Sequence, residues 1–326
     1  MWLAQVRRTL SQRGLLPPRA RVLVALSGGP DSAGLLLALS TLAPELGLQL
    51  RAASIDHGLR PEAKDDVAVA AEQAKNVGLK LEVATLTLEP GADLQARART
   101  ARYQALLEIA RTEHCDRVAV GHTQDDQAET VLARILRGAS IRGLRGIHAS
   151  RDDGVVRPLI DLPASEVHAA VAAAGWPVVH DPSNALLTFQ RVRLRRELLP
   201  ALVQESPGAI RHLAELADDA AHVHELIEAM ATGVLGAARL PDEPAIHIEP
   251  LRRAPIAVRR EVLALACSEL ANTRPSRAQL LELELLLRGR GEVTLARGAK
   301  VSVDPEKGAL CFTGPEEPSE RGDKDL

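Results

Sequence analysis

Arg21-Val-Leu-Val-Ala-Leu26 is followed directly by Ser27-Gly28-Gly29-Pro30-Asp31-Ser32 and then by an apolar run over residues 33–42. The unbroken aliphatic hexamer predicts a buried parallel strand, and a proline in the first turn of the apolar run predicts a helix. The paired glycines let the backbone turn tightly and approach a ligand closely. Because the first helical N–H groups face this loop, the stretch predicts an anion-binding site.

The polar side chains of this loop suit a phosphate accompanied by a divalent cation. Ser27 and Ser32 add hydroxyl donors, whereas Asp31 would repel phosphate unless a cation such as Mg²⁺ lies between them. The spacing excludes the Gly-x-x-x-x-Gly-Lys-Ser/Thr and Gly-x-Gly-x-x-Gly loops. A glycine turn without a ligand is the alternative. The full string resembles the pyrophosphate loop of the ATP-pyrophosphatase (PP-loop) superfamily, which implies cleavage of ATP into AMP and pyrophosphate.

Composition indicates an ordinary globular protein. Of the 326 residues, 46% are hydrophobic and 25% are charged, and no apolar run is long enough to span a membrane. The first residues lack a signal-peptide core, so we expect a cytoplasmic protein with no membrane partner. Three scattered cysteines without a Cys-x-x-Cys pair indicate neither a disulfide framework, a zinc site nor an iron–sulfur site. With a net charge of −3, any contact with nucleic acid must come from a local basic patch.

Strand and helix patterns alternate after the first loop. Further strands are expected at residues 50–55, 79–86, 116–121 and 155–160, with helices at 64–77 and 93–114. This alternation predicts an α/β fold with a doubly wound, mainly parallel five-stranded sheet and helices on both faces. Ligands of such sheets bind at the carboxyl ends of the strands, where Asp56 and His57 follow the second strand.

The end of the fourth strand carries a second polar string, Gly121-His122-Thr-Gln-Asp125-Asp126-Gln-Ala-Glu129-Thr130. Thr123 and Asp126 have the spacing of a capping box, so a helix is expected to begin here. Asp125 and Glu129 then share one helix face and repel each other unless a cation, an arginine or a protonated group lies between them. An acidic first turn that complements the helix dipole is the alternative. Convergence of these groups beside the first loop favours a functional site.

Positive charge is concentrated between residues 131 and 200, which hold ten arginines, no lysine and six acidic residues. Arg142 and Arg145 lie in a glycine-spaced loop that could follow a phosphate backbone. Arg191 and Arg195 align on a helix that is expected to end at Pro200, and they suit a phosphate or a carboxylate. Ser165 is expected to cap a helix that runs to residue 174.

The chain is expected to divide into four parts. Residues 1–200 form the PP-loop catalytic domain, 201–290 a helical domain, 291–313 a small β region and 314–326 a disordered tail. Within the helical domain, patterns at 207–238, 255–271 and 276–288 predict helices, with Ser276 as a cap.

Six ordered strings are similar to the tRNA(Ile)-lysidine synthase family, and the similarity is closest over residues 20–200. They begin at Asp56, Ala98, Gly121, Arg157, Asp181 and Arg195. The resemblance implies an adenine nucleotide alpha hydrolase-like fold and ATP-dependent ligation of L-lysine to C2 of the wobble cytidine in the CAU anticodon of tRNA(Ile). It also implies Mg²⁺ as a cofactor, and release of AMP and pyrophosphate.

The resemblance and the residue chemistry together assign expected roles. Catalysis is expected of Asp31, Asp125 and Asp126, with Asp31 also holding Mg²⁺, and pyrophosphate binding of Ser27, Gly28, Gly29, Pro30, Asp31 and Ser32. The pocket for ATP or lysine is expected to contain Asp56, His57, Gly121, His122 and Glu129. Contacts to tRNA are expected of Arg142, Arg145, Arg191 and Arg195.

Two other functions remain open at this point. A PP-loop tRNA cytidine thiolase uses the same ATP chemistry, but its usual cysteine pair is missing here. A non-catalytic ATP-binding sensor would leave the acidic string at residues 125–129 without a purpose. Asp125 and Asp126 are equal candidates for the base that deprotonates lysine. The oligomeric state is not decided by the sequence, and a homodimer is one alternative.

Overall fold

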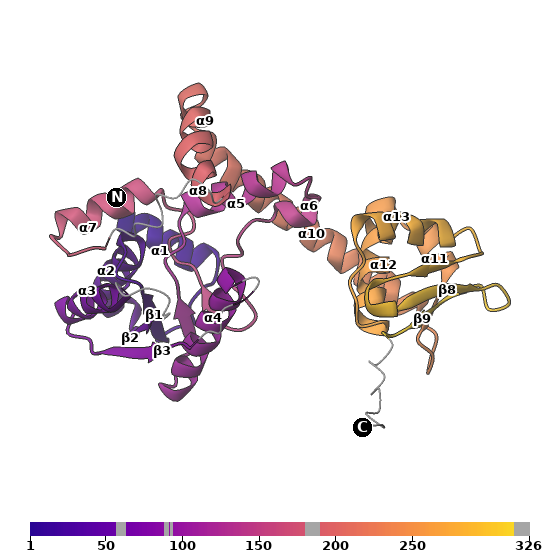
Figure 1. Cartoon of the computed structure of the whole chain (residues 1–326), viewed down its shortest axis with the longest axis horizontal. Helices are drawn as coiled ribbons and strands as arrows, with labels where there is room; N and C mark the ends of the chain where they lie inside the picture. Colours follow the sequence, from indigo (N-terminus) through magenta and orange to yellow (C-terminus); the bar gives the residue numbers. More distant parts are fainter. Residues whose placement is uncertain (57–62, 88–90, 92–93, 180–189, 316–326) are drawn as a thin grey trace, which may run out of the picture. The chain divides into compact units, whose positions relative to one another are not determined.

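The computed structural model of the protein describes residues 1–56, 63–87, 91, 94–179 and 190–315. The chain divides into two compact units, Met1–Ala220 and Ala221–Leu326 (Figure 1). His57 and the end of the expected disordered tail lie outside the described residues. The proposed division into domains at residues 200 and 290 stays a prediction.

The first unit is built on a five-stranded parallel sheet with the strand order β3-β2-β1-β4-β5. Its strands are β1 (Arg21–Leu26), β2 (Gln49–Asp56), β3 (Leu81–Thr85), β4 (Arg117–Ala119) and β5 (Val155–Val156). The predicted sheet is confirmed, but its fifth strand is shorter than the expected 155–160. It ends at Val156 because the chain turns at Arg157 and Pro158 has no N–H for a ladder.

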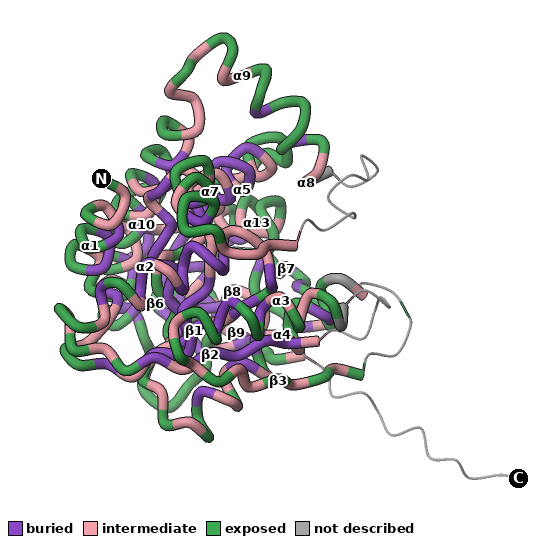
Figure 2. Tube along the Cα trace, turned by 90° about the vertical axis from the view of Figure 1, so that its left-hand side faces the viewer, coloured by how far each residue is buried: buried purple, intermediate pink, exposed green. Residues whose placement is uncertain are grey.

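Helices cover both faces of this sheet, as a doubly wound fold requires. Side chains alternate along β1, so Val22 and Val24 face one layer of helices and Leu23 faces the other. The first layer contains α1 (Trp2–Gln12), α2 (Pro30–Leu46), α3 (Ala63–Asn76) and α7 (Ala164–Ala173), and the second contains α4 (Leu94–Thr112) (Figure 1). Figure 2 shows β1 and β2 as buried segments between these layers.

A separate apolar cluster around Ala128, Leu132, Leu194 and Leu199 joins the other long helices of the first unit. Its residues come from α5 (Gln124–Leu136), a π-helical turn (Leu194–Leu198), α9 (Leu199–Glu205) and the start of α10 (Ala209–Ala238). The short helices α6 (Ile141–Leu144) and α8 (Gln190–Arg193) complete this unit.

Two helix boundaries differ from the prediction. The helix that was expected to end at Pro200 widens into a π-helical turn, Leu194–Leu198, and continues to Glu205. Pro200, which has no N–H to donate, lies directly after the π-helical turn, where the regular hydrogen-bond ladder of the helix is already interrupted. Ser165 does not cap α7, which begins at Ala164. The N–H of Ala164 instead donates a hydrogen bond to the carboxylate of Asp125.

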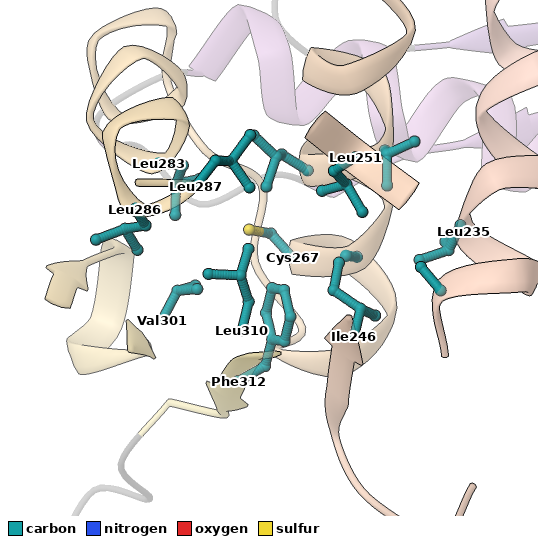
Figure 3. Close-up of a cluster of buried hydrophobic side chains, with 14 of the residues drawn as sticks. Leu235, Ile246, Leu251, Cys267, Leu283, Leu286, Leu287, Val301, Leu310 and Phe312 are labelled. Atoms are coloured by element: carbon teal, nitrogen blue, oxygen red, sulfur yellow. The ribbon is translucent and has the colours of Figure 1, made fainter. Parts of the chain in front are cut away.

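The second unit packs helices against a small antiparallel sheet of order β6-β9-β8-β7. Its elements are β6 (Ala245–His247), α11 (Ile248–Arg253), α12 (Ile256–Leu270), α13 (Arg277–Leu286), β7 (Glu292–Thr294), a 3₁₀ turn (Ala296–Gly298), β8 (Lys300–Asp304) and β9 (Ala309–Thr313). Figure 3 shows Ile246, Leu283 and Phe312 in their common core. The predicted cap is confirmed, since Ser276 Oγ accepts from the Gln279 N–H at 3.2 Å. The short β6 and α11 were not predicted.

The described part of the chain contains no helix that is both long enough and apolar enough to cross a membrane.

Gly34 sets how closely α2 and α7 can pack. A Cβ atom at this position would lie 2.2 Å from Cγ1 of Val167. Gly34→Ala is therefore expected to lower the free energy of unfolding by about 1–3 kcal/mol, measured by urea denaturation. A second change, Val167→Ala, should restore part of this loss by making room for the new methyl group.

The matched control is Gly233→Ala on α10, where nothing lies within 4 Å of the added Cβ. We expect this variant to be unchanged or slightly stabilised because alanine favours helix. Equal effects of alanine at both glycines would contradict the packing argument.

Candidate active site

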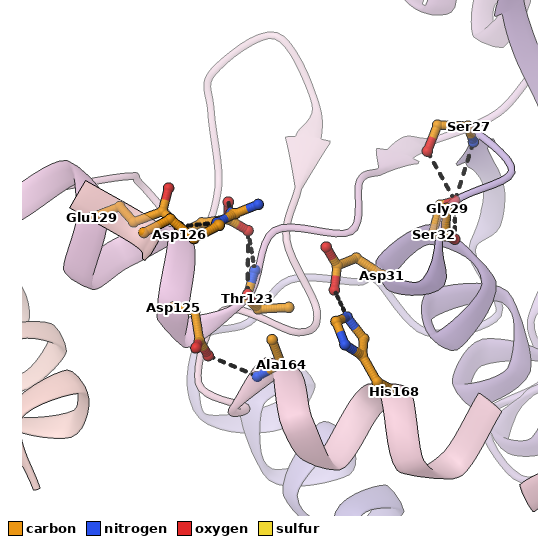
Figure 4. Close-up of polar contacts among 11 residues, drawn as sticks. Ser27, Gly29, Asp31, Ser32, Thr123, Asp125, Asp126, Glu129, Ala164 and His168 are labelled. Atoms are coloured by element: carbon orange, nitrogen blue, oxygen red, sulfur yellow. Dashed lines mark hydrogen bonds and ion pairs between the residues drawn. The ribbon is translucent and has the colours of Figure 1, made fainter. Parts of the chain in front are cut away.

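The loop after β1 is closed by its own hydrogen bonds. Ser32 Oγ accepts from the Ser27 N–H at 3.1 Å and donates to the Gly29 carbonyl at 3.0 Å (Figure 4). Gly28 has a φ of +76°, a left-handed conformation that favours glycine, and Pro30 begins α2. The sequence Ser-Gly-Gly-Pro-Asp-Ser thus forms a tight turn directly in front of a helix N-terminus, which suits an anion.

The end of β4 touches the start of α2 through Gly121. A Cβ atom on Gly121 would lie 2.8 Å from the Asp31 carbonyl oxygen and 3.0 Å from the Ser32 nitrogen. Only glycine permits this approach. It occurs between the neighbouring strands β1 and β4, at the point where the strand order reverses and where such sheets bind ligands.

A cavity of about 420 Å³ opens beside this contact. Its walls contain Asp31 from α2, Asp125 and Glu129 from α5, His168 from α7 and Arg195 from the π-helical turn. Asp31 and the acidic string after β4 therefore share one hollow, although 94 residues separate Asp31 from Asp125 in the sequence.

Asp31 is paired with a histidine that the sequence did not single out. His168 Nε2 lies 2.8 Å from Asp31 Oδ1 (Figure 4). This hydrogen bond raises the pKa of His168 above its usual value, although partial burial opposes the shift. A carboxylate at a helix N-terminus beside a phosphate loop is also an oxygen donor of the kind Mg²⁺ prefers. Asp31 therefore fits the expected metal as one of its ligands.

Asp125 and Asp126 occupy different positions. Asp125 lines the cavity, and its Oδ2 accepts from the Ala164 N–H at 2.7 Å. Asp126 is 7% exposed, and its Oδ2 accepts from the Thr123 N–H at 2.9 Å. The predicted capping box is therefore confirmed. Asp125 faces the space that a substrate could enter, whereas Asp126 fixes the start of α5.

Arg195 supplies a cation between the acidic side chains. Its Nη2 lies 3.1 Å from Asp126 Oδ1, and its Nε donates to Glu129, whose side chain is 1% exposed. Although burial opposes it, the charge of Glu129 raises the pKa of Arg195. The structure thus places Arg195 in the acidic cavity, whereas Arg142 and Arg145 lie on and just after α6. The side chain of Arg191 lies outside the described residues.

Asp56 is the last residue of β2, and His122 follows Ala119, the last residue of β4, by three positions. Both therefore lie at the carboxyl end of the sheet. His122 Nδ1 accepts from Arg157 Nε at 3.3 Å, so the ring is held in its neutral form. Burial lowers the pKa of His122 to about 3, with the nearby Asp126 opposing the shift. His122 is therefore a neutral side chain that is hydrogen-bonded to Arg157 just after β4.

A family model described as a PP-loop domain matches residues 3–202. The chain is 38% identical over 288 residues to a tRNA(Ile)-lysidine synthase of Methylobacterium nodulans. The aligned region covers 86% of this chain and 84% of the relative. It is 36% identical over 313 residues to a tRNA(Ile)-lysidine synthase of Salinispora tropica, and this alignment covers 92% of this chain and 93% of that relative.

The chain belongs to the tRNA(Ile)-lysidine synthase family. The predicted resemblance is confirmed, and the PP-loop domain supports use of ATP. A solved U34-tRNA thiolase from Methanococcus maripaludis has a TM-score of 0.57 and 19% identity, covering 67% of this chain and 77% of that one. At this identity the thiolase supports the fold alone.

The spacing of residues in the sequence predicted the loop and the acids after β4, but not His168. This residue lies on α7, 137 positions after Asp31, and no motif surrounds it. A single histidine on a helix gives no signal until the fold brings it to its partner. Arg195 was predicted, but its pairing with Glu129 and Asp126 was not.

His122 predicts an acid-dependent loss of stability. Its pKa is lower in the folded chain than the usual value of about 6.5, so the unfolded chain binds more protons below that pH. The contribution of neutral His122 to the free energy of unfolding is therefore complete above pH 6.5. It is lost as the pH falls toward the pKa of His122 in the folded chain. Asparagine keeps an acceptor for Arg157 but does not titrate.

We expect the drop in the free energy of unfolding between pH 7 and pH 5 to be smaller in His122→Asn by up to about 2 kcal/mol. Urea denaturation at both pH values measures this difference. Identical pH profiles for the two proteins would show that His122 titrates normally.

Proposed function

We propose that this protein ligates L-lysine to C2 of the wobble cytidine in the CAU anticodon of tRNA(Ile), using ATP and releasing AMP and pyrophosphate. One observation carries the proposal: Asp31 of the phosphate loop and the acidic residues after β4 line one cavity, in a chain of the tRNA(Ile)-lysidine synthase family. An adenylating step and an amine-transfer step need these two kinds of group side by side.

The first step activates the cytidine. Its O2 attacks the α-phosphorus of ATP, and the bond from that phosphorus to the bridging oxygen breaks, so that pyrophosphate leaves. The turn at Ser27–Ser32 and the N-terminus of α2 present backbone N–H donors to this leaving group. Asp31 would hold Mg²⁺, which when bound offsets the negative charge that develops on the phosphates.

The second step transfers lysine. Its ε-ammonium has a free pKa near 10.4 and must lose a proton before the nitrogen can attack C2 and expel AMP. Asp125 on the cavity wall supports binding of this ammonium, because Glu129 is buried and already paired with Arg195. The partly exposed guanidinium of Arg195 suits the α-carboxylate. Asp125 is the favoured proton acceptor because it lines the cavity, whereas both oxygens of Asp126 are engaged.

The segment after α5 suits the tRNA backbone because it is basic and firmly held. Gln127 is 3% exposed, and its amide accepts from the Ile147 N–H at 2.5 Å and donates to the Ile147 carbonyl at 3.1 Å. Arg134 Nη1 donates to the carbonyls of Gly143 and Gly146 at 2.6 and 2.8 Å. These bonds give the segment that carries Arg142 and Arg145 one defined shape.

The two other functions have less support. Residues 1–220 contain a single cysteine, Cys115, so the unit with the PP-loop offers no pair of thiolates for a thiolase. A non-catalytic sensor needs no acidic wall around a 420 Å³ cavity. The ligase is therefore the function that we propose.

The direct test supplies ATP, labelled L-lysine and a mixed tRNA pool, and then identifies the labelled nucleoside. We expect label only in the wobble cytidine of the CAU-anticodon tRNA(Ile). Binding of ATP without any labelled nucleoside would instead support the sensor, and label elsewhere would exclude the proposed substrate.

Three variants separate the two chemical steps. Asp31→Asn is expected to reduce both tRNA-dependent ATP–pyrophosphate exchange and lysine incorporation at least 100-fold, because it weakens charge stabilisation at the phosphates. Asp125→Asn should reduce lysine incorporation similarly but preserve the exchange, because it removes only the proton acceptor. Asp126→Asn should instead lower the free energy of unfolding by about 1–2 kcal/mol.

The matched control is Glu166→Gln, which neutralises an exposed carboxylate on α7 near the cavity and should keep full activity. If Asp126→Asn rather than Asp125→Asn preserved exchange and lost ligation, the proton acceptor would be Asp126.

Gln127→Leu tests whether the fixed shape of the segment that carries Arg142 and Arg145 contributes to tRNA binding. Leucine cannot form the two hydrogen bonds to Ile147, so the segment that carries Arg142 and Arg145 loses its fixed shape in the free protein. Binding of tRNA must then also supply the free energy that orders this segment, and tRNA affinity should fall about five- to tenfold. ATP affinity should not change. Filter-binding titrations measure both, and Arg142→Ala with Arg145→Ala serves as comparison because it should also flatten the salt dependence. Unchanged tRNA affinity in Gln127→Leu would remove the segment from the interface.

A further inference from the structure

Gln73 on α3 is the one buried glutamine that contacts the phosphate loop directly, among the residues that the structure describes. Its side chain is fully buried. Nε2 donates to the Gly28 carbonyl at 2.9 Å and to the Pro177 carbonyl at 2.8 Å. Both neighbours of the amide nitrogen are acceptors, so this orientation of the amide is the only one that forms the two bonds.

The second amide atom of Gln73 is costly to bury. Within the described chain, Oε1 has no hydrogen-bond partner. A buried amide oxygen that loses its water without gaining a donor destabilises the fold. A leucine or methionine would fill this volume without that cost, so packing alone does not account for a glutamine here.

The Gly28 carbonyl is held from two sides. The N–H of Val179 donates to it at 2.9 Å, beside the bond from Gln73. A Cβ on Gly28 would lie 2.7 Å from the Asp66 carbonyl oxygen, so α3 lies directly against this turn. Gly28 therefore has little freedom to rotate its peptide group.

Fixing this carbonyl also fixes a donor. The peptide between Gly28 and Gly29 is planar and trans, so its N–H points opposite to its C=O. Because the carbonyl points to Gln73, the Gly29 N–H points away from α3, at the N-terminus of α2. It thus joins the other N–H groups of the first helical turn, which have no intrahelical partners.

We propose that Gln73 is a positioning residue for the pyrophosphate part of ATP: by holding the Gly28 carbonyl, it aims the Gly29 N–H at the β- and γ-phosphates. This inference rests on the proposed function, because it takes ATP as the ligand of the loop. It adds a residue from outside every motif in the sequence, and it makes α3 part of the nucleotide site.

The test compares ligands that differ in phosphate content. Dissociation constants for ATP, inorganic pyrophosphate and AMP are measured by calorimetric titration for the full chain and for Gln73→Leu. We expect affinity for ATP and pyrophosphate to fall at least tenfold, with AMP affinity within a factor of two of the original. A residue with a merely structural role would not distinguish pyrophosphate from AMP.

Gln49→Leu is the matched control, since Gln49 lies at the opposite end of the same sheet, paired with Arg21. It should leave all three constants unchanged. If Gln73→Leu does not fold, Gln73→Met replaces it, because methionine adapts to irregular buried space.

Equal affinities for pyrophosphate in the original chain and the Gln73 variant would overturn the proposal, as would an equal loss for AMP and pyrophosphate. Failure of the original chain to bind ATP or pyrophosphate would instead overturn the proposed function, so the two failures are distinct.

Discussion

The contact between Gly121 and the main chain of Asp31 is the constraint on which the site depends. β1 and β4 are neighbours in the sheet, and each ends in a polar loop, but their loops meet only because Gly121 has no side chain. The approach brings the start of α2 and the start of α5 to one hollow. A larger residue would separate phosphate loop and acids while leaving the rest of the sheet intact, so the chemistry depends on this contact more than the fold does.

Bringing carboxylates together creates an electrostatic problem that distant parts of the chain solve. Asp31, Asp125 and Glu129 line the same cavity, where reduced solvent strengthens their repulsion. Arg195 reaches Glu129 from a π-helical turn, a helix irregularity that is common at functional sites. His168 meets Asp31 from α7. The segments that follow the sheet in sequence therefore complete the charge balance of the strand ends.

Local patterns in the sequence predicted the parts of this site that local physics determines. The loop at Ser27–Ser32, the parallel sheet and the cap formed by Thr123 and Asp126 all follow from short-range spacing, and the structure agrees. His168 and Gln73 could not be predicted in this way. Each acts on a residue at least 45 positions away, and a histidine or glutamine on a helix has no distinctive pattern. The early end of β5 was not predicted because the apolar residues around Pro158 continue the strand pattern past the point where the proline ends the ladder.

The site separates groups that line the cavity from groups that set its geometry. Charged side chains line the cavity, where an ammonium, a carboxylate or a metal-bound phosphate would need them. The support behind the phosphate loop is instead a glutamine, Gln73, whereas the segment that carries Arg142 and Arg145 is held both by Gln127 and by the guanidinium of Arg134. A buried charge behind the phosphate loop would add to the field at the cavity and would itself need a partner. An amide gives directional hydrogen bonds to main-chain groups with no net charge, so Gln73 can fix the phosphate loop without changing the electrostatics that this loop presents.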